Sequence, residues 1–261
     1  MHPDASGRAL LTYDGSMAGF LTGVFEVYDR RLRDVKLEKE STHQPSILYP
    51  ATAIATDAAK ARRVWQGLCK KLSPDAQQQF FQAFLSELAG MEDVLLAYAR
   101  HVFENAHGVE TDYGYAPVLE VQQTARKVWR EKHRMEAFVR FQKLQDGLWY
   151  AAVDPDYNVL PLISAHFKSR YADMPWLIYD LRRRYGIHYQ PEPGVVNEVE
   201  MQWAEGSNAT PDATVLEATE PEYQALWQTY FKHTGIPARK NLKLHLKHIP
   251  TRYWRYLPEK R

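Results

Sequence analysis

Aromatic and basic residues alternate at the end of the sequence, which reads HLKHIPTRYWRYLPEKR over residues 245–261. Arginine and lysine side chains bind phosphates, and tyrosine or tryptophan rings stack on bases without sequence preference. This mixture indicates a nucleic-acid contact. The candidate residues that bind nucleic acid are Arg183, from the run of arginines at 182–184, and Lys243, Lys247, Arg252, Tyr253, Trp254 and Arg255. In the alternative interpretation the rings belong to a hydrophobic core, and the arginines reach water or pair with acidic residues.

The net charge of +1 hides two segments of opposite charge. Residues 185–231 contain eight acidic residues and no lysine or arginine, whereas residues 239–261 contain eight basic residues against Glu259 alone. Such segregation predicts either a polyanionic partner for the basic segment or pairing of the two segments inside the fold.

Candidate catalytic residues lie where predicted strands and helices end. They are Asp156, His166 and Asp180, and an aspartate–histidine pair can act as a general acid and base if the two side chains converge. In the structural alternative, three consecutive arginines cannot all face one way, so at least one arginine of the run at 182–184 pairs with Asp173 or Asp180. The sequence therefore leaves open whether the chain is an enzyme.

Asp14, Gly15 and Ser16 form a turn before a predicted helix. Backbone N–H groups at a helix N-terminus attract phosphate, so this turn is a candidate phosphate-binding site. The alternative is a plain capped turn, because aspartate and serine are both common N-cap residues.

Several classes of site are disfavoured. The single cysteine, Cys69, rules out an intramolecular disulfide and a thiolate zinc or iron–sulfur site built from this chain alone. His233, His245 and His248 have no acidic ligand at a matching spacing, so we expect neither a metal nor a bound cofactor. The motifs G-x-G-x-x-G, Walker A, H-E-x-x-H and G-x-S-x-G are absent. No apolar run approaches about 18 residues, so we expect no membrane association and a cytoplasmic location.

The first part of the chain is predicted to be rich in helices. A strand at 9–13 and a helix from 17 are followed by a helix that Thr56 or Asp57 caps. Ser73, Pro74 and Asp75 signal another helix start, and its apolar face is predicted to continue to Val102. A further helix is predicted over 119–144.

The second part changes to an extended pattern. Strands are predicted at 148–153, 176–180, 185–189 and 195–203, with a helix that Asn158 caps between the first two. This order favours an antiparallel sheet. We therefore expect an α+β fold with a helix-rich subdomain at 9–115 and an α+β subdomain at 116–261, or one composite domain that includes both. In it the N-terminal half packs on a small antiparallel sheet, and the basic, aromatic C-terminal segment closes the fold.

Four stretches of the chain resemble a bacterial family of DNA metabolism or repair proteins. They are YDGS, DPDYNVLPLISAHFKSRY, PWLIYDLRRRYGIHY and HIPTRYWRYLPEK. The family positions that match are Tyr13–Ser16, Asp156, Asn158, Pro161, His166, Phe167, Trp176, Asp180, Arg183, Tyr185, Pro250, Arg252, Tyr253, Trp254, Leu257 and Pro258. Tyr157 departs from the pattern, since a histidine is expected there.

The resemblance implies a genomic context. Family members are encoded beside a radical-SAM protein of DNA modification or repair, and some are fused to a domain similar to uracil-DNA glycosylase. With one cysteine, this chain cannot hold a radical-SAM cluster, so the resemblance implies a separate radical-SAM partner.

Three functions follow as hypotheses. The first is an accessory protein of DNA metabolism or repair that binds nucleic acid and works with a radical-SAM partner. The second is an enzyme acting on DNA or a nucleotide through a cleft of histidine, aspartate and arginine. The third is a protein-interaction module whose acidic segment, around 190–222, docks the partner.

Overall fold

The computed structural model describes residues 9–44, 51–105, 108–200, 216–220, 222, 224–226, 228–229 and 249–260. The chain divides into two compact units, residues 1–128 and 129–261, and each unit is described by itself. The division falls within one helix, α5 (Ala116–Phe138).

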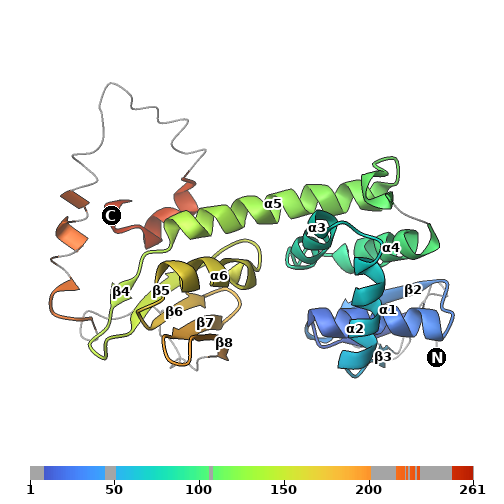
Figure 1. The fold of residues 1–261 in the computed structure, drawn as a ribbon, viewed down its shortest axis with the longest axis horizontal. Helices are drawn as coiled ribbons and strands as arrows, with labels where there is room; N and C mark the ends of the chain where they lie inside the picture. The colour runs from blue at the N-terminus through green and yellow to red at the C-terminus, as the bar shows by residue number, and fades with distance from the viewer. Residues whose placement is uncertain are drawn as a thin grey trace. The chain divides into compact units, whose positions relative to one another are not determined.

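The first unit contains a parallel three-stranded sheet. The strands β1 (Ala9–Tyr13), β2 (Val35–Lys39) and β3 (Thr52–Ala53) pair in the order β2-β1-β3. The short helices η1 (Glu40–Thr42) and η2 (Val109–Thr111) lie in this unit. The helices α1 (Met17–Asp29), α2 (Ala58–Cys69), α3 (Pro74–Phe84) and α4 (Met91–Glu104) complete it (Figure 1). The β2 strand was missed from the sequence, although VKLEK alternates apolar and polar residues as a half-buried strand does.

Helix starts in this unit agree with the capping signals. Ser16 caps α1, Asp57 caps α2 and Ser73 caps α3 through side-chain oxygens that accept backbone N–H groups. The single helix predicted from Pro74 to Val102 is wrong, because α3 ends at Phe84 and α4 begins at Met91. Glu87 and Gly90 adopt positive φ angles of 53° and 82°, which a continuous right-handed helix excludes.

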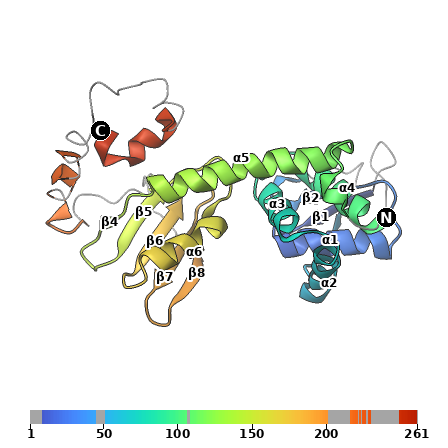
Figure 2. The ribbon, with the colours of Figure 1, turned by 45° about the horizontal axis from the view of Figure 1, so that its top comes forward.

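The second unit is built on a five-stranded sheet of order β4-β5-β6-β7-β8. Its strands are β4 (Gln142–Lys143), β5 (Trp149–Val153), β6 (Trp176–Asp180), β7 (Tyr185–Gln190) and β8 (Val195–Glu200). The helix α6 (Leu160–Arg170) connects β5 to β6 and lies over one face of the sheet (Figures 1 and 2). Two short helices, η4 (Thr251–Tyr256) and η5 (Pro258–Lys260), lie at the end of the described chain.

The α+β class is confirmed, but the purely antiparallel sheet is wrong. The β5 and β6 strands are parallel, while the other neighbouring pairs in this sheet are antiparallel. A helix that crosses over a sheet returns the chain in the same direction, which makes the two flanking strands parallel. Every residue of β6 is buried, as expected for a central strand covered on both faces.

Two smaller predictions about α5 and α6 also need correction. The helix predicted to reach residue 144 ends at Phe138, after which the chain turns into β4. Asn158 does not cap α6, because its Oδ1 accepts the Tyr185 hydroxyl at 2.5 Å.

No helix among the described ranges is both long enough and apolar enough to cross a membrane.

Candidate functional site

The buried Asp180 holds together the loops at the carboxyl ends of β5 and β6. Its carboxylate is 0% exposed and accepts the backbone N–H groups of Arg182 and Arg183 at 2.9 and 3.0 Å. The Arg183 guanidinium donates to the same carboxylate at 2.9 Å and to the carbonyls of Pro155 and Asp156. Burial raises the pKa of Asp180 and outweighs the opposing effect of the Arg183 charge. Asp180 therefore pairs with an arginine of the run, as the structural alternative predicted.

The C-terminal arginines pair with carboxylates of the second unit. Arg252 donates to Glu131 at 2.7 Å and also pairs with Asp156, and Arg255 pairs with Asp154. None of these three carboxylates belongs to the acidic segment at 185–231. Together with Asp180, Arg182 and Arg183, these side chains form a group that is here called the arginine–carboxylate cluster. Its members are Glu131, Asp154, Asp156, Asp180, Arg182, Arg183, Arg252 and Arg255.

The aromatic residues of η4 are largely engaged within the protein. Tyr253 is 2% exposed, its ring packs on Phe138 at 5.4 Å, and its hydroxyl donates to Glu131 at 2.6 Å. The Trp254 indole N–H donates to the Ile249 carbonyl at 3.1 Å. Tyr253 therefore belongs to the hydrophobic core, in agreement with the alternative interpretation of the sequence, and its ring has no accessible face for a base. Lys243 and Lys247 lie outside the described residues.

The acidic segment at 185–231 contacts the β4 strand. Lys143 of β4 pairs with Glu217 at 2.9 Å, and its backbone N–H donates to Glu220. In the described part of the chain, Arg252 and Arg255 form ion pairs with Glu131, Asp154 and Asp156, which lie outside the acidic segment. The histidines considered as metal ligands, His233, His245 and His248, also lie outside the described ranges.

The Asp14 turn is closed around its own carboxylate. Asp14 accepts the Ser16 N–H and hydroxyl at 2.9 and 2.7 Å and the Thr56 hydroxyl at 2.7 Å. Burial raises the pKa of Asp14, but the hydrogen bonds from Ser16 and Thr56 outweigh this effect and hold the pKa below its ordinary value. A negative charge therefore lies where a phosphate would approach α1. This arrangement favours the capped-turn alternative over the phosphate site.

His166 lies apart from the two aspartates proposed as its partners. Its Nδ1 is 3.8 Å from the Glu136 carboxylate, and within the described part of the chain no hydrogen bond or ion pair joins it to Asp156 or Asp180. The three proposed catalytic side chains are thus not brought together as one hydrogen-bonded group.

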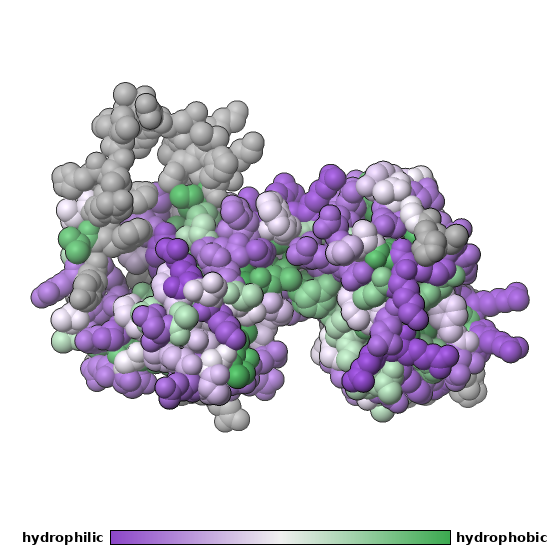
Figure 3. Space-filling model, viewed as in Figure 1, coloured by the Kyte–Doolittle hydropathy of each residue, from purple (hydrophilic) through white to green (hydrophobic). Residues whose placement is uncertain are grey.

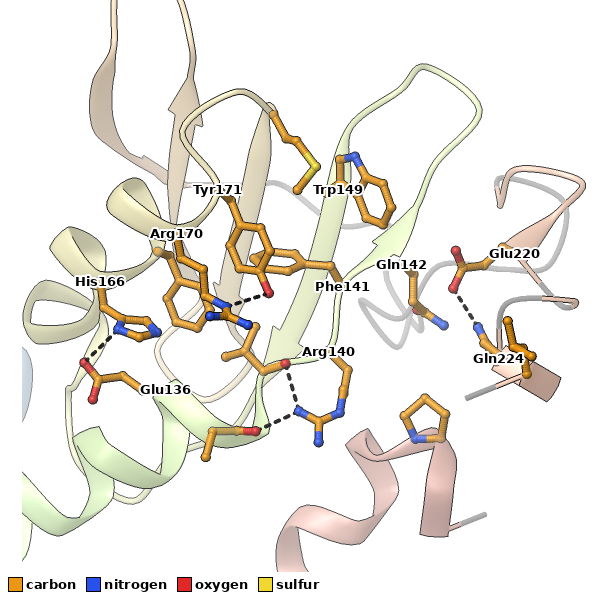
Figure 4. Close-up of a pocket in the computed structure, with 16 residues that line it drawn as sticks. Glu136, Arg140, Phe141, Gln142, Trp149, His166, Arg170, Tyr171, Glu220 and Gln224 are labelled. Atoms are coloured by element: carbon orange, nitrogen blue, oxygen red, sulfur yellow. Dashed lines mark hydrogen bonds and ion pairs between the residues drawn. The ribbon is translucent and has the colours of Figure 1, made fainter. Parts of the chain in front are cut away.

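Instead, His166 borders a cavity of about 1050 Å³ in the second unit, here called the aromatic cavity (Figure 4). Its rings come from β5, α6 and the segments beside them: Phe141, Trp149, Phe167 and Tyr171. Its polar lining is formed by Glu136, Arg140, Gln142, His166, Arg170, Glu220 and Gln224. Figure 4 shows Gln142 pointing toward Gln224 across the cavity, with the Phe141 and Tyr171 rings together on one side.

The ring cluster is held by its neighbours. The Phe141 ring meets the Tyr171 ring edge-on at 5.3 Å and the Phe167 ring at 5.7 Å. Behind them, the buried Trp176 contacts both phenylalanines at 6.4 and 6.2 Å. The rings are therefore fixed before any ligand enters, which lowers the entropy that binding would cost.

The two arginines of the cavity differ in their partners. Arg140 donates to the Glu259 carboxylate at 2.8 Å and to the Ala137 carbonyl at 2.7 Å. Arg170 is exposed, lies over the Tyr171 ring at 5.7 Å and donates to its hydroxyl at 3.4 Å. No carboxylate in the described residues pairs with Arg170. The cavity thus offers a cation beside an aromatic face.

The sequence did not single out the aromatic cavity. Phe167, Arg170 and Tyr171 stand three and four residues apart, the spacing that places side chains on one helix face. This spacing was the sequence signal that these three side chains lie together. Trp149 and Phe141 reach the same place from other elements, and no local pattern shows that they converge.

A family model for a domain of unknown function, DUF4130, matches residues 89–259. The match covers more than half of the chain. The chain belongs to the DUF4130 family. A comparison with curated proteins finds no match.

The DUF4130 match includes both sites described here. It runs from the start of α4 through α5 and the mixed sheet into η5, so the arginine–carboxylate cluster and the aromatic cavity lie within it. The sheet of the first unit lies outside the match.

Proposed function

We propose that this DUF4130 protein is an accessory protein of DNA metabolism or repair that binds nucleic acid, and that its aromatic cavity receives an unstacked base. The observation that carries the proposal is the combination of the Tyr171 ring with the exposed Arg170 at the edge of the cavity. Proteins that bind single strands use the same combination, in which rings stack on bases and cations hold the backbone.

The cavity has the parts that a base requires. Phe141, Trp149 and Tyr171 supply aromatic faces, and the Gln142 and Gln224 amides supply donors and acceptors for base edges. A cavity of about 1050 Å³ is large enough for a base with its sugar and phosphate. Arg170 then lies where a phosphate would remain in water.

The proposal of a protein partner rests on the family resemblance. The resemblance to DNA metabolism proteins supports a radical-SAM protein as the protein that acts on the bound nucleic acid. In this scheme the DUF4130 chain holds the strand, and the partner carries the redox chemistry.

The contribution of Arg170 is tested by salt titration of single-stranded DNA binding. For Arg170→Gln, we expect weaker binding and a slope of log K against log salt that is smaller by about 1, because one phosphate contact is lost. Lys168→Gln is the matched control, since Lys168 is exposed on the same helix but does not line the cavity. Equal effects of the two substitutions, or no single-stranded binding by the wild-type chain at low salt, would contradict the proposal.

A second candidate function is an enzyme acting on DNA or a nucleotide. The His166 imidazole at the edge of the cavity favours it, because an imidazole can transfer protons. The Glu136 carboxylate, 3.8 Å from the His166 Nδ1, would have to approach to hydrogen-bond distance to orient the ring. Product analysis of DNA incubated with the chain and its partner tests this function. Loss of product with His166→Ala, while DNA binding is unchanged, would favour the enzyme over the accessory protein.

A further inference from the structure

A tryptophan stands on the solvent-facing side of α5 in the second unit. Trp129 is 51% exposed, although a tryptophan side chain normally buries most of its large apolar surface. The face of this unit drawn in Figure 3 is mostly hydrophilic, and in the described part of the unit the exposed large hydrophobic side chains are Trp129, Val195 and Leu226. Exposed aromatic surface of this kind marks interaction sites.

The ring is held in a fixed orientation by His133, one helical turn later. The two ring planes differ by 4° and their centroids lie 5.7 Å apart, so the rings are stacked. The His133 side chain is itself 72% exposed. The pair therefore presents parallel flat surfaces to solvent without support from the hydrophobic core.

The surroundings of this pair are cationic. The exposed positions of α5 from residue 129 onward are Trp129, Arg130, His133 and Ala137, and none of these carries a carboxylate. Of the two glutamates of this stretch, Glu131 is buried in the arginine–carboxylate cluster, and Glu136 pairs with Lys132 at 2.7 Å and lies 3.8 Å from the His133 Nδ1. The charge of the face complements an anion, and its rings complement a ligand with flat groups.

The position of the pair relates it to the aromatic cavity. Ala137 follows His133 by one turn on the same helix face, and it lines the cavity. With a rise of 1.5 Å per residue, Trp129 lies about 12 Å along the axis from Ala137. A strand that leaves the cavity along α5 therefore passes the stacked rings.

We propose that Trp129 and His133 form a second base-stacking site for single-stranded nucleic acid, here called the α5 platform. This proposal rests on the proposed function, because the strand that reaches the platform is the one held in the cavity. A single strand is favoured over a duplex, since duplex bases already stack on each other and have no free face for a tryptophan.

The test compares Trp129→Ala with wild type in binding single-stranded oligothymidylates. For an oligonucleotide of roughly 4–16 nucleotides, the usual site size of a single-strand-binding fold, we expect affinity to fall by roughly 5-fold to 100-fold. The salt slope should stay unchanged, because the ring carries no charge. A dinucleotide, which is too short to span cavity and platform, should bind wild type and variant equally.

Two further variants control for folding and for ring chemistry. Trp129→Phe should recover part of the affinity, since it retains an aromatic face. Tyr113→Ala removes an exposed ring of the first unit, 46% exposed, and should leave the affinity unchanged. Circular dichroism of each variant checks that the overall helix content is retained.

The outcomes separate the platform from the proposed function. Wild-type binding of single strands that Trp129→Ala leaves unchanged would overturn the platform alone. Equal weakening of duplex and single-strand binding would overturn the stacking mechanism, and a Trp129-dependent protein complex without any DNA effect would assign the face to a protein partner instead. A wild-type chain that binds no oligonucleotide would overturn both proposals.

Discussion

Single residues of the arginine–carboxylate cluster show why charge alone is a poor guide to a ligand site. Arg252 and Arg255 are the residues that most suggested a polyanion contact, yet both are paired with carboxylates of their own unit. Arg170 drew no attention in the sequence, yet it lies exposed beside an aromatic ring at the aromatic cavity. What distinguishes these arginines is the presence of a nearby carboxylate, which depends on tertiary structure.

Asp180 is predicted to act on stability and not on catalysis. Asp180→Asn places an amide N–H2 group where a carboxylate oxygen accepts the Arg183 guanidinium, whose side chain is 11% exposed. Two buried donors then face each other, so we expect a loss of roughly 1–3 kcal/mol in the free energy of unfolding. Urea unfolding at neutral pH measures this loss. Asp173→Asn, at an exposed position, is the control and should lie within about 0.5 kcal/mol of wild type.

The pKa of Asp180 adds a pH dependence with a definite sign. Because burial raises its pKa in the folded state, the folded protein holds the proton more tightly than the unfolded chain does. The contribution of this group therefore favours folding most below the ordinary aspartate pKa and declines as the pH rises through the raised value. The free energy of unfolding of wild type minus that of Asp180→Asn should therefore fall as the pH rises from the ordinary aspartate pKa through the raised pKa. A full-length variant as stable as wild type would contradict the structural role.

At the scale of elements, the sequence predicted those parts that local chemistry determines. The strand at 176–180 and the capped starts of α1, α2 and α3 agree with the structure because a buried β run and N-cap residues are local signals. The break between α3 and α4 was missed because Leu85, Leu88 and Met91 continue the helical spacing across it. The parallel pairing of β5 and β6 was missed although the strand–helix–strand order around α6 indicated it.

The turn before α4 offers a test of this break. Gly90 has a φ angle of +82°, so Gly90→Ala places a side chain in the left-handed region, and we expect a loss of about 1–2 kcal/mol in the free energy of unfolding. No heavy atom lies within 4 Å of the added Cβ, so the effect is conformational and not a clash.

Gly114→Ala is the control for that substitution, because Gly114 is not among the glycines with positive φ. Thermal unfolding of both variants measures the difference. Equal melting temperatures for Gly90→Ala and wild type would show that α3 and α4 do not require this turn.

At the scale of the whole molecule, ion pairs between segments far apart in the sequence determine which charged side chains are engaged within the protein. Arg252 pairs with Glu131, which lies 121 residues earlier, and Arg255 pairs with Asp154, which lies 101 residues earlier. Charge segregation in the sequence could not choose among the available carboxylates. The aromatic cavity likewise collects side chains from α5, β5, α6 and the segment near residue 224. The sequence therefore suggested a nucleic-acid partner without locating the proposed site.

The most direct measurement of the central proposal is photo-crosslinking of the chain to a single-stranded oligonucleotide that carries 5-iododeoxyuridine, followed by mass spectrometry of the crosslinked peptides. An iodinated base crosslinks to the aromatic ring on which it stacks. We expect crosslinks at Trp149, Tyr171 or Phe141 of the aromatic cavity and, with longer strands, at Trp129. Crosslinks confined to other parts of the chain, or none in a sample that binds the oligonucleotide, would contradict the assignment of the cavity as the base site.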